Sequence, residues 1–171
     1  MKTKELMCYA ILGCAATFSL VVKAELMDGD KTFLTMAAQS DVNEISLSQL
    51  AETKASSPNT RTFAQKMVTD HQMLEAKMKP FADAAGIAPP TDVDSDHQAE
   101  LSKLNGLSGA AFDKEYMSAM AMDHHKALEA FTSEESTTKD AKFKATVKQG
   151  KEIVAHHTKM ADEMHAKMSS M

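Results

Sequence analysis

Apolar residues recur every three or four positions in four long segments of this chain, which is the spacing of one face of an α-helix. The four apolar faces consist of Phe33, Ala37, Leu47 and Ala51; of Phe63, Met67, Leu74, Met78 and Phe81; of Phe112, Tyr116, Met120, Ala127 and Phe131; and of Phe143, Val147, Val154, Ala161, Met164 and Met168. The chain has no runs with the period-two alternation that is typical of β-strands. This pattern predicts an all-α protein with four long helices.

Turn-forming residues place the ends of these helices. The predicted helices cover about Asp30–Lys54, Thr60–Ala85, Ala110–Thr132 and Asp140 to near the C-terminus. Pro80 is expected to kink or end the second helix, because proline cannot donate the helical hydrogen bond. Polar turns are expected over residues 55–59 and 133–139, so the first two helices and the last two form tightly connected pairs.

A longer crossover joins the two pairs. It runs from Thr91 to Gly109, and residues 95–104 within it are predicted to form a short extra helix. Two tight helix pairs with one long crossover are typical of a ferritin-like four-helix bundle, although a simple up-and-down bundle has similar elements. A chain of 171 residues with 43% apolar residues suits one such domain.

The first 24 residues resemble a secretory signal peptide rather than part of the fold. Lys2 and Lys4 precede an apolar stretch over Leu6–Val22, and cleavage is predicted after Ala24. Residues 25–171 would then form the bundle in the periplasm or cell envelope. Two alternatives are a membrane anchor and a lipoprotein signal ending at Cys14, but polar interruptions disfavour the first, and the apolar run beyond Cys14 disfavours the second.

The charge of the mature chain narrows the choice of partners. Removing the leader takes away three lysines and Glu5, leaving 16 basic and 23 acidic residues, a net charge of −7. A chain this acidic with no basic stripe is a poor ligand for nucleic acid or anionic membrane surfaces. A partner in the envelope or a homo-oligomer remains open. Both cysteines lie in the leader, so the mature chain forms no disulfide.

Polar side chains interrupt the apolar face of each long helix. Successive steps of about 100° turn Glu44, His71, His124 and His157 toward the interior, whereas His156 points away. Counting from the predicted turns at about 1.5 Å per residue puts the first three at the same depth, with His157 roughly one turn away. We therefore expect one polar layer inside an otherwise apolar bundle.

One carboxylate and three imidazoles are ligand types for Zn, Fe, Mn or Cu. Asp70, Asp123 and Tyr116 are candidates to orient these ligands by hydrogen bonds, without touching the metal themselves. The sequence thus predicts a transition-metal site at the four inward groups. The alternative is a structural layer in which the buried histidines and the glutamate satisfy one another without metal.

Catalytic motifs are missing from the sequence. A diiron oxidase of this architecture needs Glu-x-x-His on two helices, and the chain has no such motif. It also lacks a nucleophile–base pair, a glycine-rich phosphate loop and a His-Glu-x-x-His zinc motif. The sequence therefore assigns no catalytic residue and favours a binding protein over an enzyme.

The C-terminal helix carries a second, weaker candidate site. Thioethers and imidazoles alternate there, at His156, Met160, Met164, His165 and Met168. Soft sulfur ligands beside imidazole suggest copper in an exported protein. Methionine also replaces leucine readily in helical cores, and that explanation is favoured for the methionines of the apolar faces. His97, alone in the acidic crossover, is expected to be a solvated loop residue.

With these residues in view, the chain resembles the exported ferritin-like family described as domain of unknown function 4142, whose members are often labelled candidate outer membrane proteins. The resemblance extends over about Asp30–Met168. It rests on Phe33, Ala37, Ala38, Glu44, Leu50, Ala51, Phe63, Ala64, Met67, Val68, Asp70, His71, Phe112, Asp113, Tyr116, Asp123, His124, His157 and Ala161. It implies a four-helix bundle at the cell envelope, implies no settled activity, and falls on the same Glu44 and three histidines.

Overall fold

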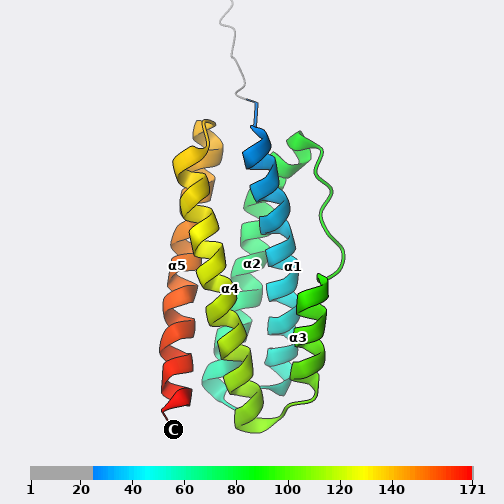
Figure 1. Ribbon diagram of the computed structural model, residues 1–171, viewed down its shortest axis with the longest axis vertical. Helices are drawn as coiled ribbons and strands as arrows, with labels where there is room; N and C mark the ends of the chain where they lie inside the picture. The colour runs from blue at the N-terminus through cyan, green and yellow to red at the C-terminus, as the bar shows by residue number, and fades with distance from the viewer. Residues whose placement is uncertain (1–24, 171) are drawn as a thin grey trace, which may run out of the picture.

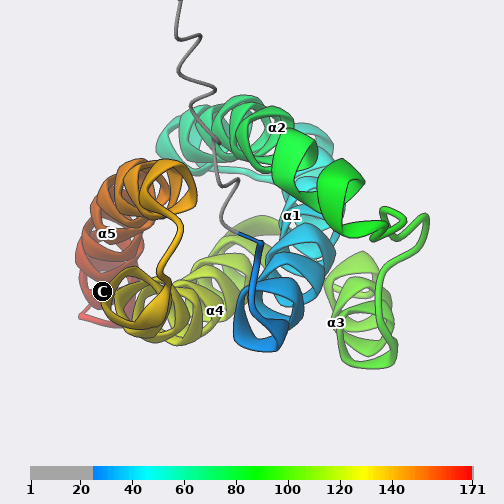
Figure 2. The same cartoon turned by 90° about the horizontal axis from the view of Figure 1, so that it is seen from above.

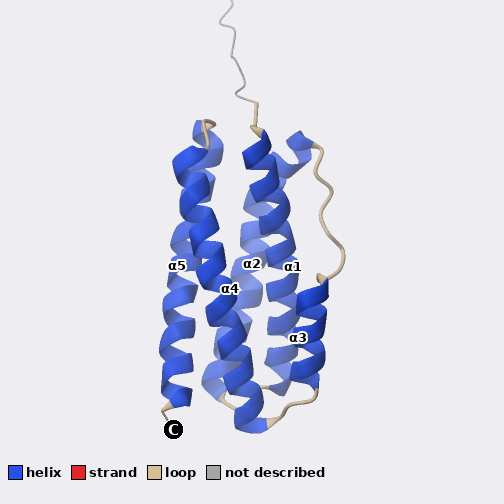
Figure 3. Ribbon diagram, in the orientation of Figure 1, coloured by secondary structure: helices blue, strands red, loops and turns tan. Residues whose placement is uncertain are grey.

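The computed structural model describes residues 25–170, and all regular elements in that range are α-helices (Figure 3). They are α1 (Asp28–Lys54), α2 (Pro58–Ala85), α3 (Ser95–Asn105), α4 (Gly109–Thr137) and α5 (Ala141–Ser169). The predicted all-α fold, with a short helix between the second and third long helices, is confirmed. The predicted signal peptide lies outside the described residues. Within residues 25–170, no helix is long and apolar enough to cross a membrane.

The four long helices stand side by side along the long axis of the molecule (Figure 1). The hairpin pairs α1–α2 and α4–α5 make the most extensive contacts, and packing of α1 on α4 and of α2 on α5 closes the bundle. Helix α3 lies outside this ring, against α1 and α4 (Figure 2). The crossover thereby covers part of the seam between α1 and α4.

Two apolar clusters fill the bundle. One contains Leu47, Phe63, Met67, Phe112, Tyr116 and Met120, and the other contains Phe33, Leu34, Leu74, Phe131, Phe143 and Val154. Between them along the helices lies a buried polar layer formed by Asp41, Glu44, His71, His124 and His157. Buried polar groups cost free energy unless they are paired, so this layer is the feature that packing alone does not explain.

One predicted helix boundary was wrong. Helix α4 continues to Thr137, where a polar turn had been predicted from Ser133 onward. The extra turn buries Glu134 against α1, and the Thr137 hydroxyl bonds to the Ser133 carbonyl. Helix α2 ends at Ala85, as predicted, and Pro80 does not end it, because Pro80 lies on the exposed side in the last turns of the helix. The carbonyl that loses its partner there is free to bond to water.

A buried carboxylate on α4 holds the turn between α1 and α2. Asp113 accepts hydrogen bonds from the backbone N–H groups of Ser56 and Ser57, at 3.0 and 2.8 Å, and from the Ser56 hydroxyl. Asp113→Ala leaves these donors without a partner, so we expect a loss of about 2–3 kcal/mol in the free energy of unfolding, measured by urea denaturation. Asp162→Ala, which removes an exposed carboxylate, should change it by less than about 0.5 kcal/mol. Equal losses in both variants would contradict the role of Asp113.

A second buried acid makes the fold sensitive to pH. Burial and the nearby Asp30 carboxyl raise the pKa of Glu134 from 4.5 to about 7. The folded protein therefore keeps a proton that the unfolded chain releases. This contribution is full below about pH 4.5 and is lost as the pH rises through 7.

Glu134→Gln removes this dependence. As the pH rises from 4.5 to 8, the free energy of unfolding should fall by up to about 3 kcal/mol less in the variant than in the wild type, because each unit of pKa shift corresponds to about 1.4 kcal/mol. Urea unfolding at several pH values measures the difference. Glu129→Gln, on the exposed side of the same helix, should follow the wild-type profile. A parallel profile for Glu134→Gln would show that Glu134 ionises normally.

Candidate metal centre

Three helices each bring one histidine into the polar layer. His71 comes from α2, His124 from α4 and His157 from α5, and their exposed fractions are 3%, 1% and 0%. In two of the helices the next or preceding residue is also a histidine, but His125 and His156 are exposed. Helical geometry separates such neighbours by about 100°, so only one member of each pair faces the interior.

The three buried rings meet at one place. Their centroids are 5.6 Å apart for His71–His124, 5.6 Å for His71–His157 and 5.3 Å for His124–His157. One nitrogen from each ring lies within 4.8 Å of the other two. Metal–imidazole bonds are about 2.0–2.1 Å long, so the rings would have to draw closer together for three nitrogens to reach a single ion. Within residues 25–170 this is the one group of three or more such side chains close enough to hold a metal.

The outer nitrogen of each ring has a hydrogen-bond partner. Nδ1 of His71 lies 2.8 Å from Oδ1 of Asp41, and Nε2 of His157 lies 2.8 Å from Oδ2 of Asp70. Nδ1 of His124 donates to the carbonyl oxygen of Met120, one turn back on α4, at 2.8 Å. Carboxylate and carbonyl partners of this kind orient metal-binding histidines and fix which nitrogen carries the proton.

The inner nitrogens have no partner. Nε2 of His71, Nε2 of His124 and Nδ1 of His157 are fully buried and make no hydrogen bond. Leaving one buried polar atom unsatisfied costs about 1–3 kcal/mol, and here three occur together. A bound cation would accept the lone pairs of all three at once.

Electrostatics keep two of the rings neutral. Burial, together with the charges on neighbouring histidines, lowers the pKa of His124 to about 3. Burial likewise lowers the pKa of His157 to about 4, despite the opposing Asp70 carboxylate. For His71, burial is outweighed by the Asp41 hydrogen bond and by nearby carboxyl groups, so its pKa is raised. At neutral pH, His124 and His157 therefore offer lone pairs rather than protons.

Glu44 occupies the same layer but stands beside the three rings. It is 2% exposed, and its Oε1 lies 3.7 Å from Nδ1 of His124, while Oε2 has no hydrogen-bond partner. Burial raises its pKa to about 8, so at neutral pH it carries a proton when no metal is bound. The carboxyl group of Glu44 does not belong to the cluster of three ring nitrogens. Its side chain would have to change rotamer to become the fourth ligand beside the three imidazoles.

Of the three residues predicted to hydrogen-bond to the metal ligands, only one contacts a histidine of the cluster. Asp70 bonds directly to His157. Tyr116 instead bonds to the Ser48 hydroxyl at 2.9 Å within the apolar cluster, and Asp123 contacts His97 and Lys126. Sequence reasoning missed Asp41, although its position three residues before Glu44 placed it on the same helix face.

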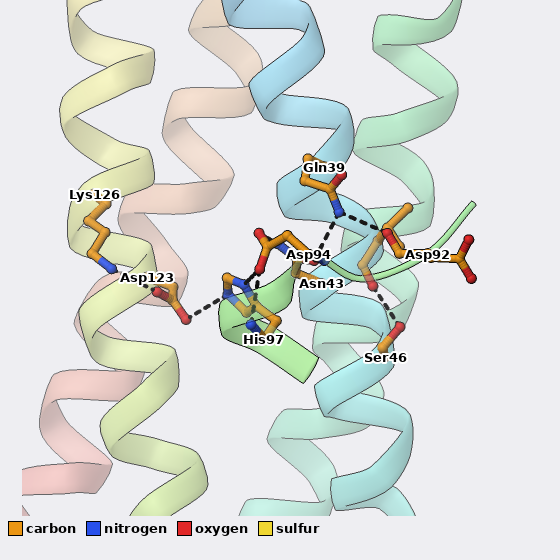
Figure 4. A network of polar contacts seen from close by, with 9 residues as sticks. Gln39, Asn43, Ser46, Asp92, Asp94, His97, Asp123 and Lys126 are labelled. Atoms are coloured by element: carbon orange, nitrogen blue, oxygen red, sulfur yellow. Dashed lines mark hydrogen bonds and ion pairs between the residues drawn. The ribbon is translucent and has the colours of Figure 1, made fainter. Parts of the chain in front are cut away.

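The expectation for His97 was wrong. It lies in the first turn of α3, where Nδ1 is 2.7 Å from Oδ1 of Asp94 and Nε2 is 3.4 Å from Oδ2 of Asp123 (Figure 4). Asn43 on α1 donates to Asp94 at 2.8 Å. The Asp123 and Asp94 carboxylates raise the pKa of His97 to about 9, so it is a cation at neutral pH. It joins the crossover helix to α1 and α4.

The C-terminal candidate residues do not share one environment. Met160, Met164 and Met168 are half-buried and pack against the apolar cluster around Tyr116. His156 is exposed and lines a groove between α2 and α5, and His165 is half-buried. The thioethers therefore contribute to the core, and copper binding at this end of the chain stays a prediction.

Two solved structures share this architecture. A candidate secreted protein of the DUF305 group from Streptomyces coelicolor superposes with a TM-score of 0.69 at 12% identity, covering 82% of this chain and 93% of that one. CopM in its Cu(II)-bound form gives a TM-score of 0.69 at 17% identity, covering 81% of this chain and 96% of its own. At these identities the similarity demonstrates a common fold and nothing more.

Family membership comes from the sequence itself. No protein with a curated description matches the chain. The model of the DUF4142 family, a domain of unknown function, matches residues 17–164, a range that includes α1 to α4, most of α5 and all three buried histidines. The protein belongs to the DUF4142 family.

Proposed function

We propose that this protein is an exported protein of the periplasm or cell envelope that binds a transition-metal ion in the middle of its helical bundle. His71, His124 and His157 supply three ligands, and Glu44 supplies the fourth after losing its proton. The observation that carries the proposal is that the two nitrogens of each imidazole differ in their environment. The outer nitrogen is hydrogen-bonded, and the inner nitrogen is buried without a partner.

A purely structural polar layer fits this arrangement less well. In such a layer the rings and the glutamate would bond to one another, since buried polar groups in native proteins almost always find partners. Here the inner nitrogens and Oε2 of Glu44 all remain without partners. The hydrogen bonds of His124 and His157 leave their free lone pairs pointing inward, and His71, whose pKa is raised, would offer its inner nitrogen after losing a proton.

The donor set narrows the choice of metal. Neutral imidazole with one carboxylate suits Zn(II), Cu(II) and Fe(II), and the hard cations Mg²⁺ and Ca²⁺ prefer oxygen ligands. Similarity to CopM, whose structure holds Cu(II), makes copper the first candidate. Because the three rings are closed to solvent, the site suits holding an ion rather than exposing it to a substrate.

The direct test is the metal content of protein purified without an affinity tag and incubated with Cu(II) or Zn(II). Wild-type protein should retain about one ion per chain after gel filtration, and the double variant His71→Ala/His124→Ala should retain none at the buried site. The matched control His125→Ala/His156→Ala removes two exposed histidines and should behave as wild type. Equal metal content in wild type and the buried double variant would reject the proposal.

A further inference from the structure

A cavity of about 650 Å³ opens between α1 and α4 and reaches into the polar layer. Its outer part is lined by Thr32, Thr35, Met36, Lys126 and Ala127, and its inner wall includes Asp41 and His71. His71 is therefore both one of the three clustered histidines and part of a cavity wall. No other described cavity is lined by any of the three.

The crossover determines where this cavity lies. Helix α3 covers the part of the α1–α4 seam nearest the turn between α1 and α2 (Figure 1). At its first turn, the chain of contacts from Asn43 through Asp94 and His97 to Asp123 spans from α1 to α4 (Figure 4). Asn43, Asp94, His97 and Asp123 all line the cavity, so this network forms one edge of it.

One of the exposed apolar side chains lies at this cavity. Among the described residues, the large apolar side chains with high exposure are all methionines: Met27, Met36, Met73 and Met122. Met36 is 43% exposed and lines the cavity. A thioether is a soft ligand that favours Cu(I), and its flexible side chain can follow an ion over a short distance.

We infer that this cavity is a loading site for a soft cation, Cu(I), at which the Met36 thioether makes the first contact and the Asp41–His71 pair receives the ion. This inference rests on the proposed function. The three ring nitrogens are closed to solvent, so an arriving ion needs a path, and the cavity wall formed by His71 is the nearest approach. The ion stays Cu(I) from the Met36 thioether to the three imidazoles, because imidazole is also a copper ligand, so the transfer requires no oxidant or reductant.

A groove between α2 and α5 is the competing path. It is lined by Asp70, Met73 and His156 among others, and Met73 is 41% exposed. The groove ends at Asp70, however, and His157 behind it is not part of its wall. An ion in the groove would therefore have to pass the Asp70–His157 hydrogen bond before meeting any of the three rings, whereas His71 and its partner Asp41 are themselves part of the cavity wall.

Three single substitutions of nearly equal volume separate these paths: Met36→Leu at the cavity, Met73→Leu at the groove, and Met122→Leu, which lines neither. The measurement is the rate of Cu(I) transfer from a chromophoric chelator to intact metal-free protein under anaerobic conditions. We expect Met36→Leu to slow loading about tenfold with little change in final affinity, and the other two to load like wild type. Zn(II) loading should be unaffected by Met36→Leu, because zinc gains little from a thioether.

A filling substitution tests the path without relying on sulfur. Ala127→Phe should obstruct the cavity and slow the loading of both metals, and its circular dichroism spectrum would show that the bundle still forms. Slower loading in Met73→Leu instead of Met36→Leu, equal rates in all variants, or an equal loss of affinity and rate in Met36→Leu would each overturn the inference. Failure of the proposed function is distinguishable, since the wild type would then bind no metal at the three histidines.

Discussion

Metal loading is expected to raise the unfolding temperature of the wild-type protein by several degrees and to leave that of His157→Ala almost unchanged. An ion that binds only the folded state at 100 times its dissociation constant adds about 2.7 kcal/mol. For a domain of this size, 1 kcal/mol shifts the midpoint by roughly 2–4 °C, so the expected rise is about 5–10 °C. Thermal unfolding without metal and with free Cu(II) or Zn(II) at about 100 times its dissociation constant, followed by chelator addition, measures it.

The adjacent residue provides the control for this experiment. His156→Ala removes the same side chain one position earlier on α5, from an exposed site, and should keep the full metal-dependent shift. If instead neither metal changes the unfolding of the wild type, while Glu44→Ala is strongly destabilising, the polar layer would be structural. The large loss would then arise because a partner of Glu44 is left unpaired.

Gly150→Ala is expected to destabilise the bundle by about 1–3 kcal/mol, although alanine is the better helix former. A Cβ atom at Gly150 would collide with Cε1 of Phe131 and would lie 3.2 Å from two further atoms of that ring. The ring of Phe131 packs edge-on against Phe33, with ring centroids 4.9 Å apart. It therefore cannot move aside without disturbing the apolar cluster to which both rings belong. The propensity gain of about 1 kcal/mol offsets only part of this overpacking.

Urea denaturation compares this variant with Gly29→Ala. Gly29 lies in the first turn of α1, and a Cβ atom there would meet no atom within 4 Å. Gly29→Ala should therefore be neutral or stabilising by up to about 1 kcal/mol, because it restricts the unfolded chain without a clash. A Gly150→Ala protein as stable as the wild type would mean that α5 can move away from α4 at little cost.

Local patterns predicted most of the helical architecture. The three- and four-residue spacing identified all four long helices, and the angular step separated His157 from the exposed His156. Both results depend only on the geometry of a single helix, in which the spacing of residues along the sequence determines their direction around the helix axis. The short helix in the crossover was also predicted, and the structure shows that Asp94 caps it.

The errors arose where distant contacts overrode local preference. Serine and threonine residues after Thr132 predicted a turn, but burial of Glu134 against α1 extends α4 through them. His97 looked solvated because its second partner, Asp123, lies on a different helix. No property of the crossover sequence shows which carboxylate of α4 it will meet.

The sequence by itself determined that a glutamate and three histidines face the interior of an all-α bundle. Only the tertiary structure decided that the three imidazoles meet while Glu44 stands beside them, and that Asp41 rather than Asp123 supports a ring. The physical reason is that periodicity specifies the direction of a side chain around its own helix. The distance between side chains on different helices depends instead on how far the helices are shifted along their axes. Which nitrogen of an imidazole ring is free to bind a metal depends on the hydrogen bond that the other nitrogen of the same ring makes.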